Sequence, residues 1–386
     1  MEFETRAIHV GQEPDPETGA VIPPIHLTST FAQVRPGETL GYDYTRSGNP
    51  NFTRLSTTLA SLEGGTFATV FGSGMAAITA VLSGLRSGDR VLAEENVYGC
   101  TFRIFDRVFE KFGLTVEYVD FANPEEYGAI ERFRPALVWL ESPTNPMLKI
   151  LDIAAISDVA KDLGIPVLVD NTFASPFFQR PLELGATLSL SSTTKYVNGH
   201  SDCLGGVVVT NDESWQQKMI FAQKAVGLNP SPFDAWLISR GVKTLALRMR
   251  CHHENALSIA ARLEGCPSIR WVRHPFLASH PQFEMARRQM SGGSGIVTFE
   301  LDADLEATRS FVSGLRLFAL AESLGGVESL VDHPASMTHA SIPRPEREKV
   351  GIFDGLVRLS VGIEDVDDLI GDLDRALARA GLTGFG

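Results

Sequence analysis

The chain has 386 residues, more than one ordinary hydrophobic core, which favours two domains. Hydrophobic residues make up 44% and charged residues 21%, as in ordinary globular proteins, while the net charge of −13 argues against binding to nucleic acid or anionic lipid. No stretch approaches the ~18 uninterrupted apolar residues of a membrane span. Four scattered cysteines without metal-ligand pairing favour a reduced, cytoplasmic protein with no metal site.

Three parts follow one another along the chain. Residues 1 to 46 hold five prolines, which argue against long helices, and an irregular segment of this length is usually functional or docked on another surface. From 47 to 245 strand-like and helix-like segments alternate, which predicts a mostly parallel sheet covered by helices. From 246 to 386 the pattern is typical of a smaller α+β domain.

The apolar periodicity predicts individual elements. The expected helices are 74–85, 101–112, 248–263 and 366–380, the last with Leu369, Ile370, Leu373 and Leu377 on one stripe. The expected strands are 90–93, 116–119, 136–140, 167–169, 188–191, 206–209, 269–272, 295–301 and 356–361.

Lys195 ends a run of small hydroxyl residues, Ser191-Ser192-Thr193-Thr194. Hydroxyl and backbone N–H groups bind phosphate, and a lysine amine condenses with aldehydes. Pyridoxal 5′-phosphate (PLP) carries both a phosphate and an aldehyde, and would satisfy the whole segment. In isolation such a run is more often a strand end with a solvated lysine, so the interpretation depends on its surroundings.

Upstream, an apolar run ends in Asp170, which fits the C-terminal end of a buried parallel strand. Functional groups cluster at that edge of open α/β sheets. A pyridine nitrogen needs a carboxylate partner to stay protonated, which Asp170 would supply. The alternative is that Asp170 only caps a helix.

Three other segments fit the same cofactor. The turn Gly72-Ser73-Gly74-Met75 opens a helix whose free N–H groups suit a phosphate, which Ser192 and Thr194 could share. Tyr98 is either a core tyrosine or a ring that stacks on the cofactor. Asn145 is either a turn residue or a donor to the cofactor's ring oxygen.

Together these segments resemble the PLP-dependent enzymes of Cys/Met metabolism, of fold type I, over almost the whole chain. The matching motifs are YDYTRSGNP (42–50), SGMAA (73–77), ESPTNP (141–146), VDNT (169–172), STTKY (192–196), GHSD (199–202), AESLGG (321–326), MTHA (337–340) and VRLSVG (357–362).

The resemblance implies an α/β fold with a mostly parallel seven-stranded sheet and a smaller α+β C-terminal domain. Residues 1–46 would form an N-terminal arm that reaches the neighbouring subunit, 47–245 the PLP-binding large domain and 246–386 the small domain. It further implies a homo-oligomer, a tetramer built from dimers with shared active sites, which acts on a small amino-acid substrate.

The resemblance also assigns roles to residues. Three catalytic residues are expected: Lys195 would hold PLP covalently and move protons, Tyr98 would stack on the ring, and Asp170 would pair with the ring nitrogen. Asn145 would contact the ring hydroxyl oxygen. The expected phosphate contacts are Gly74, Met75, Ser192 and Thr194, with Tyr44 and Arg46 from the neighbouring subunit. The expected substrate contacts are Asp43, Arg103, Glu322, Ser323, Thr338 and Arg358, of which Arg358 would clamp the carboxylate.

Within the family, the substrate is harder to assign. Glu322 and Arg103 are similar to γ-lyases and γ-synthases that handle cystathionine, and acidic groups would attract its distal ammonium. Cys100 is similar to methionine γ-lyases, and Lys224 departs from the asparagine common in cystathionine enzymes. We expect cystathionine γ-lyase activity, with cystathionine γ-synthase and then methionine γ-lyase activity as alternatives.

Two other classes of protein remain as alternatives. An inactive relative that acts as a binding protein is opposed by the intact set of Lys195, Asp170 and Arg358. A nucleotide-binding enzyme built on the glycines near Ser73 is opposed by the lack there of Gly-x-x-x-x-Gly-Lys-Ser/Thr and of Gly-x-Gly-x-x-Gly.

Overall fold

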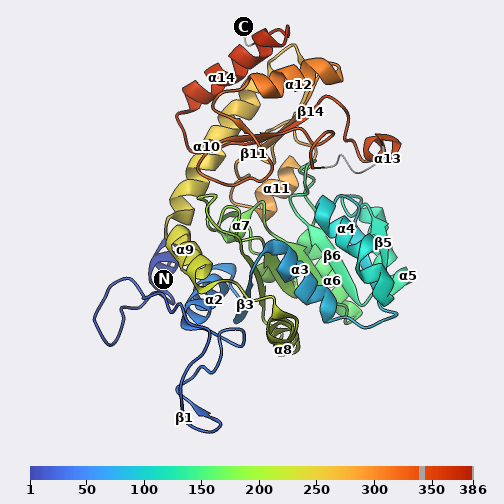
Figure 1. Cartoon of the computed structure of the whole chain (residues 1–386). Helices are drawn as coiled ribbons and strands as arrows, with labels where there is room; N and C mark the ends of the chain where they lie inside the picture. Colours follow the sequence, from blue (N-terminus) through green and yellow to red (C-terminus); the bar gives the residue numbers. More distant parts are fainter. Residues whose placement is uncertain (339–343, 385–386) are drawn as a thin grey trace.

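A seven-stranded sheet forms the centre of the chain, and a computed structural model describes residues 1–338 and 344–384 (Figure 1). The strand order is β3-β9-β8-β7-β6-β4-β5. The strands are β3 (Phe67–Phe71), β4 (Arg90–Glu94), β5 (Thr115–Val119), β6 (Leu137–Glu141), β7 (Val167–Asp170), β8 (Leu188–Ser191) and β9 (Gly206–Thr210). Strands β5, β4, β6, β7 and β8 run parallel, whereas β9 is antiparallel to both β8 and β3. The predicted mostly parallel, seven-stranded sheet is confirmed.

Helices cover both faces of this sheet. One face packs on α3 (Gly74–Ser83), α4 (Gly99–Arg107) and α8 (Glu213–Ala222), and the other on α5 (Gly128–Phe133) and α6 (Ile153–Asp162). Successive strand residues point to opposite faces. In β7, Leu168 therefore packs in the core under α3, α4 and α8, while Val167 and Val169 pack in the core under α5 and α6. Burial on both faces explains why the central strands β6 and β7 are apolar up to the carboxylate that ends each of them.

A second sheet of five strands lies in the C-terminal part, in the order β10-β11-β14-β13-β12. Its strands are β10 (Ile269–Arg273), β11 (Ile296–Leu301), β12 (Ala319–Leu320), β13 (Leu330–Asp332) and β14 (Leu356–Ser360). Three helices pack on it: α10 (Leu245–Glu264), α12 (Leu305–Gly314) and α14 (Val366–Arg379). The long α10 runs from the large sheet up to the small one (Figure 1). The predicted stripe of α14 faces this core, with Leu369, Leu373 and Leu377 fully buried and Ile370 partly buried.

The remaining helices are α1 (Phe3–His9), α2 (Pro50–Glu63), α7 (Ser175–Phe178), α9 (Pro232–Gly241), α11 (Phe283–Gln289) and α13 (Arg344–Lys349). The expected helix 101–112 is instead α4 followed by a 3₁₀ turn, Phe109–Phe112, whose tighter winding packs Phe109 against the core. None of the described helices combines the length and the apolar character needed to cross a membrane. His339 and Ala340, from the MTHA motif, lie outside the described residues.

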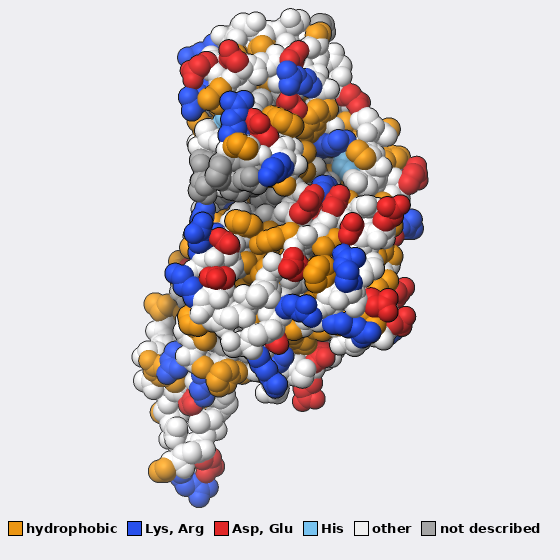
Figure 2. Space-filling view, turned by 90° about the vertical axis from the view of Figure 1, so that its right-hand side faces the viewer, with side chains coloured by type: hydrophobic (Ala, Val, Ile, Leu, Met, Phe, Trp, Pro, Cys, Tyr) orange, Lys and Arg blue, Asp and Glu red, His pale blue; other side chains and the backbone are white. Residues whose placement is uncertain are grey.

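Helix α1 packs on the body with Phe3 and Ala7 buried, whereas the segment after it extends away as an arm that carries a small hairpin of β1 (Gln33–Arg35) and β2 (Glu38–Thr39) (Figure 1). In Figure 2 hydrophobic side chains are scattered over this arm among polar and charged ones. Val21, Leu27 and Leu40 are 74%, 73% and 85% exposed.

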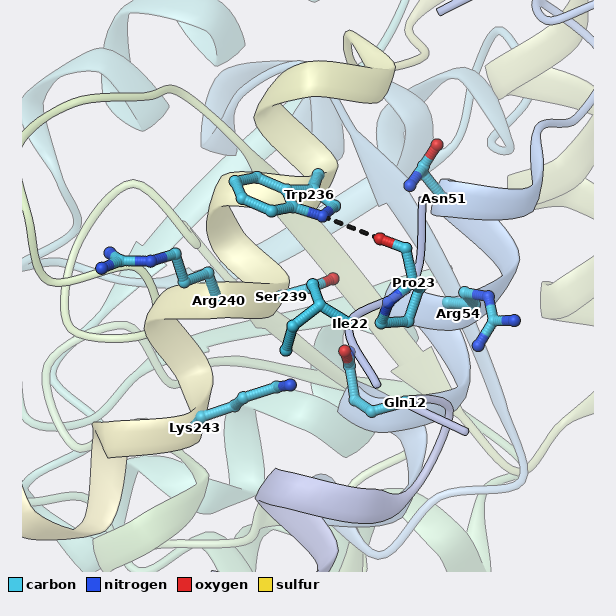
Figure 3. Close-up of a pocket in the computed structure, with 9 residues that line it drawn as sticks. All are labelled: Gln12, Ile22, Pro23, Asn51, Arg54, Trp236, Ser239, Arg240 and Lys243. Carbon is cyan, nitrogen blue, oxygen red and sulfur yellow. Dashed lines mark hydrogen bonds between the residues drawn. The ribbon is translucent and has the colours of Figure 1, made fainter. Parts of the chain in front are cut away.

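The root of the arm, in contrast, is fixed to the body. The indole Nε1 of Trp236, in α9, donates a hydrogen bond to the carbonyl oxygen of Pro23 at 3.0 Å (Figure 3). The side chain of Asn51 accepts from the backbone of His26 and donates to that of Pro24. A small cavity of about 130 Å³ remains beside Trp236. The arm therefore leaves the body in a defined direction.

Candidate active site

A cavity of about 350 Å³ lies at the C-terminal ends of β6, β7 and β8 and receives side chains from both parts of the chain. It brings together twelve of the predicted site residues: Gly74, Met75, Tyr98, Asn145, Asp170, Ser192, Thr194, Lys195, Glu322, Ser323, Thr338 and Arg358. This is the edge of a parallel sheet at which ligands usually bind.

Lys195 follows β8 and points at the C-terminal part of the chain. Its Nζ donates a hydrogen bond to the Ser323 hydroxyl at 2.6 Å. Burial and the nearby Arg358 cation lower the pKa of the Lys195 amine to about 8, against the opposing effect of Glu322. A much larger fraction of this amine is therefore neutral near physiological pH than for an ordinary lysine. Ser323 has a φ of +100°, a strained conformation for a residue other than glycine, of the kind that clusters at functional sites.

Asp170 ends β7, as predicted. Its Oδ1 accepts hydrogen bonds from the Thr172 backbone N–H at 3.0 Å and from the Thr172 hydroxyl at 2.6 Å. Burial nevertheless raises the pKa of Asp170 to about 6. A positively charged partner, such as a protonated ring nitrogen, would stabilise the ionised form of this buried carboxylate.

The start of α3 offers a site for a phosphate. The Ser73 hydroxyl caps the helix by accepting from the Ala76 N–H, whereas the N–H groups of Gly74 and Met75 have no acceptor within the described part of the chain. A Cβ atom on Gly74 would lie 2.8 Å from the Cβ of Ser192, so only glycine lets the two segments approach this closely. Together with Lys195 and Asp170, these groups match the phosphate, the aldehyde and the ring nitrogen of PLP.

Arg358 lies in β14, buried at the wall of the cavity. Its Nη1 donates to the Asn145 Oδ1 at 2.9 Å, and its Nη2 donates to the Ser323 carbonyl oxygen at 3.2 Å and lies 3.4 Å from an Asp332 oxygen. Its Nε has no acceptor among residues 1–338 and 344–384. The guanidinium is thus held in place with a donor still unsatisfied, as suits a site for a carboxylate.

Tyr98 precedes α4 at the cavity. Burial, and next the hydrogen bond with Cys100, raise the pKa of the Tyr98 phenol well above its usual value, while Arg358 opposes the shift. The phenol is therefore protonated at neutral pH. The backbone N–H of Tyr98 donates to Glu141, a second buried carboxylate of the cavity.

Four of the predicted residues do not line the cavity: Asp43, Tyr44, Arg46 and Arg103. On the arm, the Arg46 guanidinium lies over the Tyr44 ring at 5.5 Å and donates to the Lys224 carbonyl oxygen at 2.8 Å. Arg103, in α4, donates to the Cys100 sulfur at 3.4 Å. Within one chain, the arm is therefore separate from the cavity, and its expected contact with the site of a neighbouring subunit stays a prediction.

Three residues of the site were not singled out from the sequence. Thr172 supports Asp170, Asp332 supports Arg358, and Glu141 supports Tyr98. Thr172 and Glu141 lie inside motifs that had been recognised, so their positions beside functional residues were a usable signal. Asp332 lies in no such motif, and only the pairing of β13 with β14 brings it to Arg358.

Comparison with known proteins agrees with this geometry. A model of the family "Cys/Met metabolism PLP-dependent enzyme" matches residues 4–378. The chain belongs to this family. As a member of the Cys/Met-metabolism family, it is a PLP-dependent enzyme, and the residues at the cavity fit that cofactor.

Relatives within the family differ in their named reaction. Cystathionine γ-lyase of Dictyostelium discoideum is 48% identical over 376 residues, which cover 97% of each chain. Cystathionine γ-synthase of Mycobacterium bovis is 50% identical over 375 residues, 97% of this chain and 96% of that one. The solved structure of cystathionine γ-synthase from Xanthomonas oryzae pv. oryzae in complex with cystathionine is 45% identical, with a TM-score of 0.96 over 99% of both chains.

Proposed function

We propose that the enzyme is a cystathionine γ-lyase, which converts cystathionine and water to cysteine, 2-oxobutanoate and ammonia. The observation that carries the choice of a cystathionine enzyme over a methionine γ-lyase is the placement of Glu322, an exposed carboxylate at the cavity that also holds Lys195 and Arg358. Arg358 suits the α-carboxylate of an amino acid, and Glu322 supplies a negative charge for the distal ammonium that cystathionine carries and methionine lacks.

The side chains divide the work at the cavity. When bound, PLP supplies an electron sink for the substrate's α carbon. Lys195, with its lowered pKa, is suited to take the α proton and to move protons between the substrate's carbons as the γ substituent leaves. Asp170 balances the charge of a protonated ring nitrogen, and Arg358 orients the substrate through its carboxylate.

The site is shared between subunits in this proposal. Tyr44 and Arg46 would reach the phosphate site of a neighbouring chain in a cytoplasmic homotetramer built from dimers. The exposed apolar side chains of the arm and its separation from the cavity of its own chain support this assignment. The proposed boundaries are 1–46 for the arm, 47–245 for the PLP-binding domain and 246–386 for the small domain.

Cystathionine γ-synthase is the second candidate, because relatives with that name are as similar to this chain as those named γ-lyase. The decisive assay offers the purified holoenzyme cystathionine, O-succinylhomoserine or O-acetylhomoserine with cysteine, and methionine, each as a separate substrate. A γ-lyase releases 2-oxobutanoate from cystathionine with the highest kcat/KM. Formation of cystathionine from an acylhomoserine, with cystathionine itself left intact, would instead establish the γ-synthase.

A further inference from the structure

Three carboxylates end three neighbouring strands of the large sheet: Glu94 in β4, Glu141 in β6 and Asp170 in β7. Asp170 already has a role opposite the ring nitrogen. Glu141 is its direct neighbour, paired with it across the two strands, and its side chain lines the same cavity. Glu141 is only 4% exposed, and the charged groups that act on it within the described residues are the carboxylates of Asp170 and Glu94. Burial of a carboxylate without a cation costs free energy, which its hydrogen bonds must offset.

Both oxygens of Glu141 accept a backbone hydrogen bond. Oε2 accepts from the Tyr98 N–H at 2.8 Å, and Oε1 accepts from the Asn145 N–H at 2.9 Å. Tyr98 and Asn145 belong to different loops, one before α4 and one after β6. A single carboxylate therefore links the two loops and sets the distance between them. One loop carries Tyr98, assigned to the face of the cofactor ring, and the other carries Asn145, assigned to the ring oxygen.

We propose that Glu141 is a positioning residue that holds Tyr98 and Asn145 in a fixed arrangement around the cofactor ring. The inference rests on the cofactor roles assigned above to these two residues, and it is independent of which substrate the enzyme uses. A carboxylate is required because both of its oxygens face an N–H donor. In a glutamine, the amide NH₂ would face one of those donors, and one of the two bonds would be lost.

Burial, and then the neighbouring Asp170, raise the pKa of Glu141 well above its usual value, while the two N–H bonds act in the opposite direction. The same bonds that position the loops thus also favour the ionised form of Glu141. Among the described residues, only these two N–H bonds oppose the effects of burial and of the neighbouring carboxylates, which distinguishes Glu141 from a member of a buried ion pair.

Glu94 provides a matched control. It is fully buried at the end of β4 and also accepts two backbone N–H bonds, from Asn96 at 3.2 Å and from Phe121 at 2.9 Å. Neither Asn96 nor Phe121 lines the cavity. Replacement of Glu94 by glutamine therefore removes the same kind of hydrogen bond from donors outside the cavity, and it also removes the ion pair of Glu94 with Lys149 at 3.6 Å.

The test compares Glu141→Gln with Glu94→Gln. Three quantities are measured without substrate: the thermal stability of the apoenzyme, the Kd of PLP by titration, and the visible circular dichroism per bound PLP, which reports the asymmetric surroundings of the ring. Both variants should lose apoenzyme stability. Glu141→Gln alone should raise the Kd of PLP about ten-fold, as expected for one lost hydrogen bond, and change the dichroism. If Glu141→Gln does not fold, Glu141→Asp replaces it, because the shorter side chain reaches only one of the two N–H groups.

A double-mutant cycle with Asn145→Ala separates positioning from general damage. If Glu141 acts through Asn145, Glu141→Gln should raise the Kd of PLP less in the Asn145→Ala background than in the wild type. Equal effects in both backgrounds, or a Kd and dichroism that match those of Glu94→Gln, would overturn the proposal. Because no substrate is present, an error in the proposed reaction would leave this result unchanged, whereas failure of the wild-type protein to bind PLP would count against the cofactor site itself.

Discussion

At the scale of single residues, burial is the main cause of the lowered pKa of Lys195; Arg358 lowers it further and Glu322 raises it. Only the neutral amine attacks the PLP aldehyde. The rate at which the apoenzyme captures PLP should therefore rise with pH and reach half its maximum near pH 8, the pKa of Lys195. Glu322→Gln should move this midpoint to lower pH and Arg358→Leu to higher pH, as followed by stopped-flow absorbance. A midpoint above pH 10, as for an ordinary lysine, would show that the site leaves the amine unperturbed.

Glu322 should govern the choice of substrate more than the shared chemistry. It is exposed at the cavity, so solvent screens its charge and a moderate effect is expected. Glu322→Val should lower kcat/KM for cystathionine about ten-fold, ~1.4 kcal/mol, and spare methionine cleavage. The measurement is the ratio of the two kcat/KM values in each enzyme. An equal loss for both substrates would remove Glu322 as a specificity residue.

At the scale of elements, α14 contributes to the hydrophobic core of the small domain and does not line the cofactor cavity. Its Leu373 is fully buried in the core of the five-stranded sheet, whereas Ile370, three residues earlier on the helix, is only partly buried. Leu373→Ala should lower the free energy of unfolding by about 2–5 kcal/mol, and Ile370→Ala should cost clearly less. Chemical denaturation of the apoenzyme gives both values. A larger loss of stability for Ile370→Ala than for Leu373→Ala would show that α14 packs on the sheet through a different face.

The central parallel strands were predicted from the sequence because burial on both faces makes them continuously apolar, as in β7, whereas β3, β12 and β13 were not predicted. Helix α2 was not predicted, although it carries its own signals: an Asn49 cap, Pro50 in the first turn and Gly64 in a left-handed conformation after the last turn. Its hydroxyl-rich surface conceals the apolar spacing. The clamp on Arg358 by Asp332 depends on strand pairing between distant segments, which no local pattern reveals.

At the scale of the whole molecule, the proposed sharing of sites predicts complementation between inactive subunits. Arg46→Ala should weaken PLP retention, and Lys195→Ala should abolish turnover. In a mixed dimer, one of the two sites would combine an intact Lys195 with an intact Arg46 from its neighbour. Activity at limiting PLP should therefore reappear when the two variants are unfolded and refolded together. Absence of activity in verified mixed oligomers would mean that the arm completes the site of its own chain.

The central claim is that PLP is held by Lys195 at the carboxyl edge of the large sheet. Reduction of the holoenzyme with borohydride makes the linkage between PLP and lysine permanent, and peptide mapping by mass spectrometry then identifies the labelled residue. The label should fall on Lys195, with none incorporated into Lys195→Ala. A label on any other lysine, or retention of a reducible linkage in Lys195→Ala, would contradict the assignment on which the active site is built.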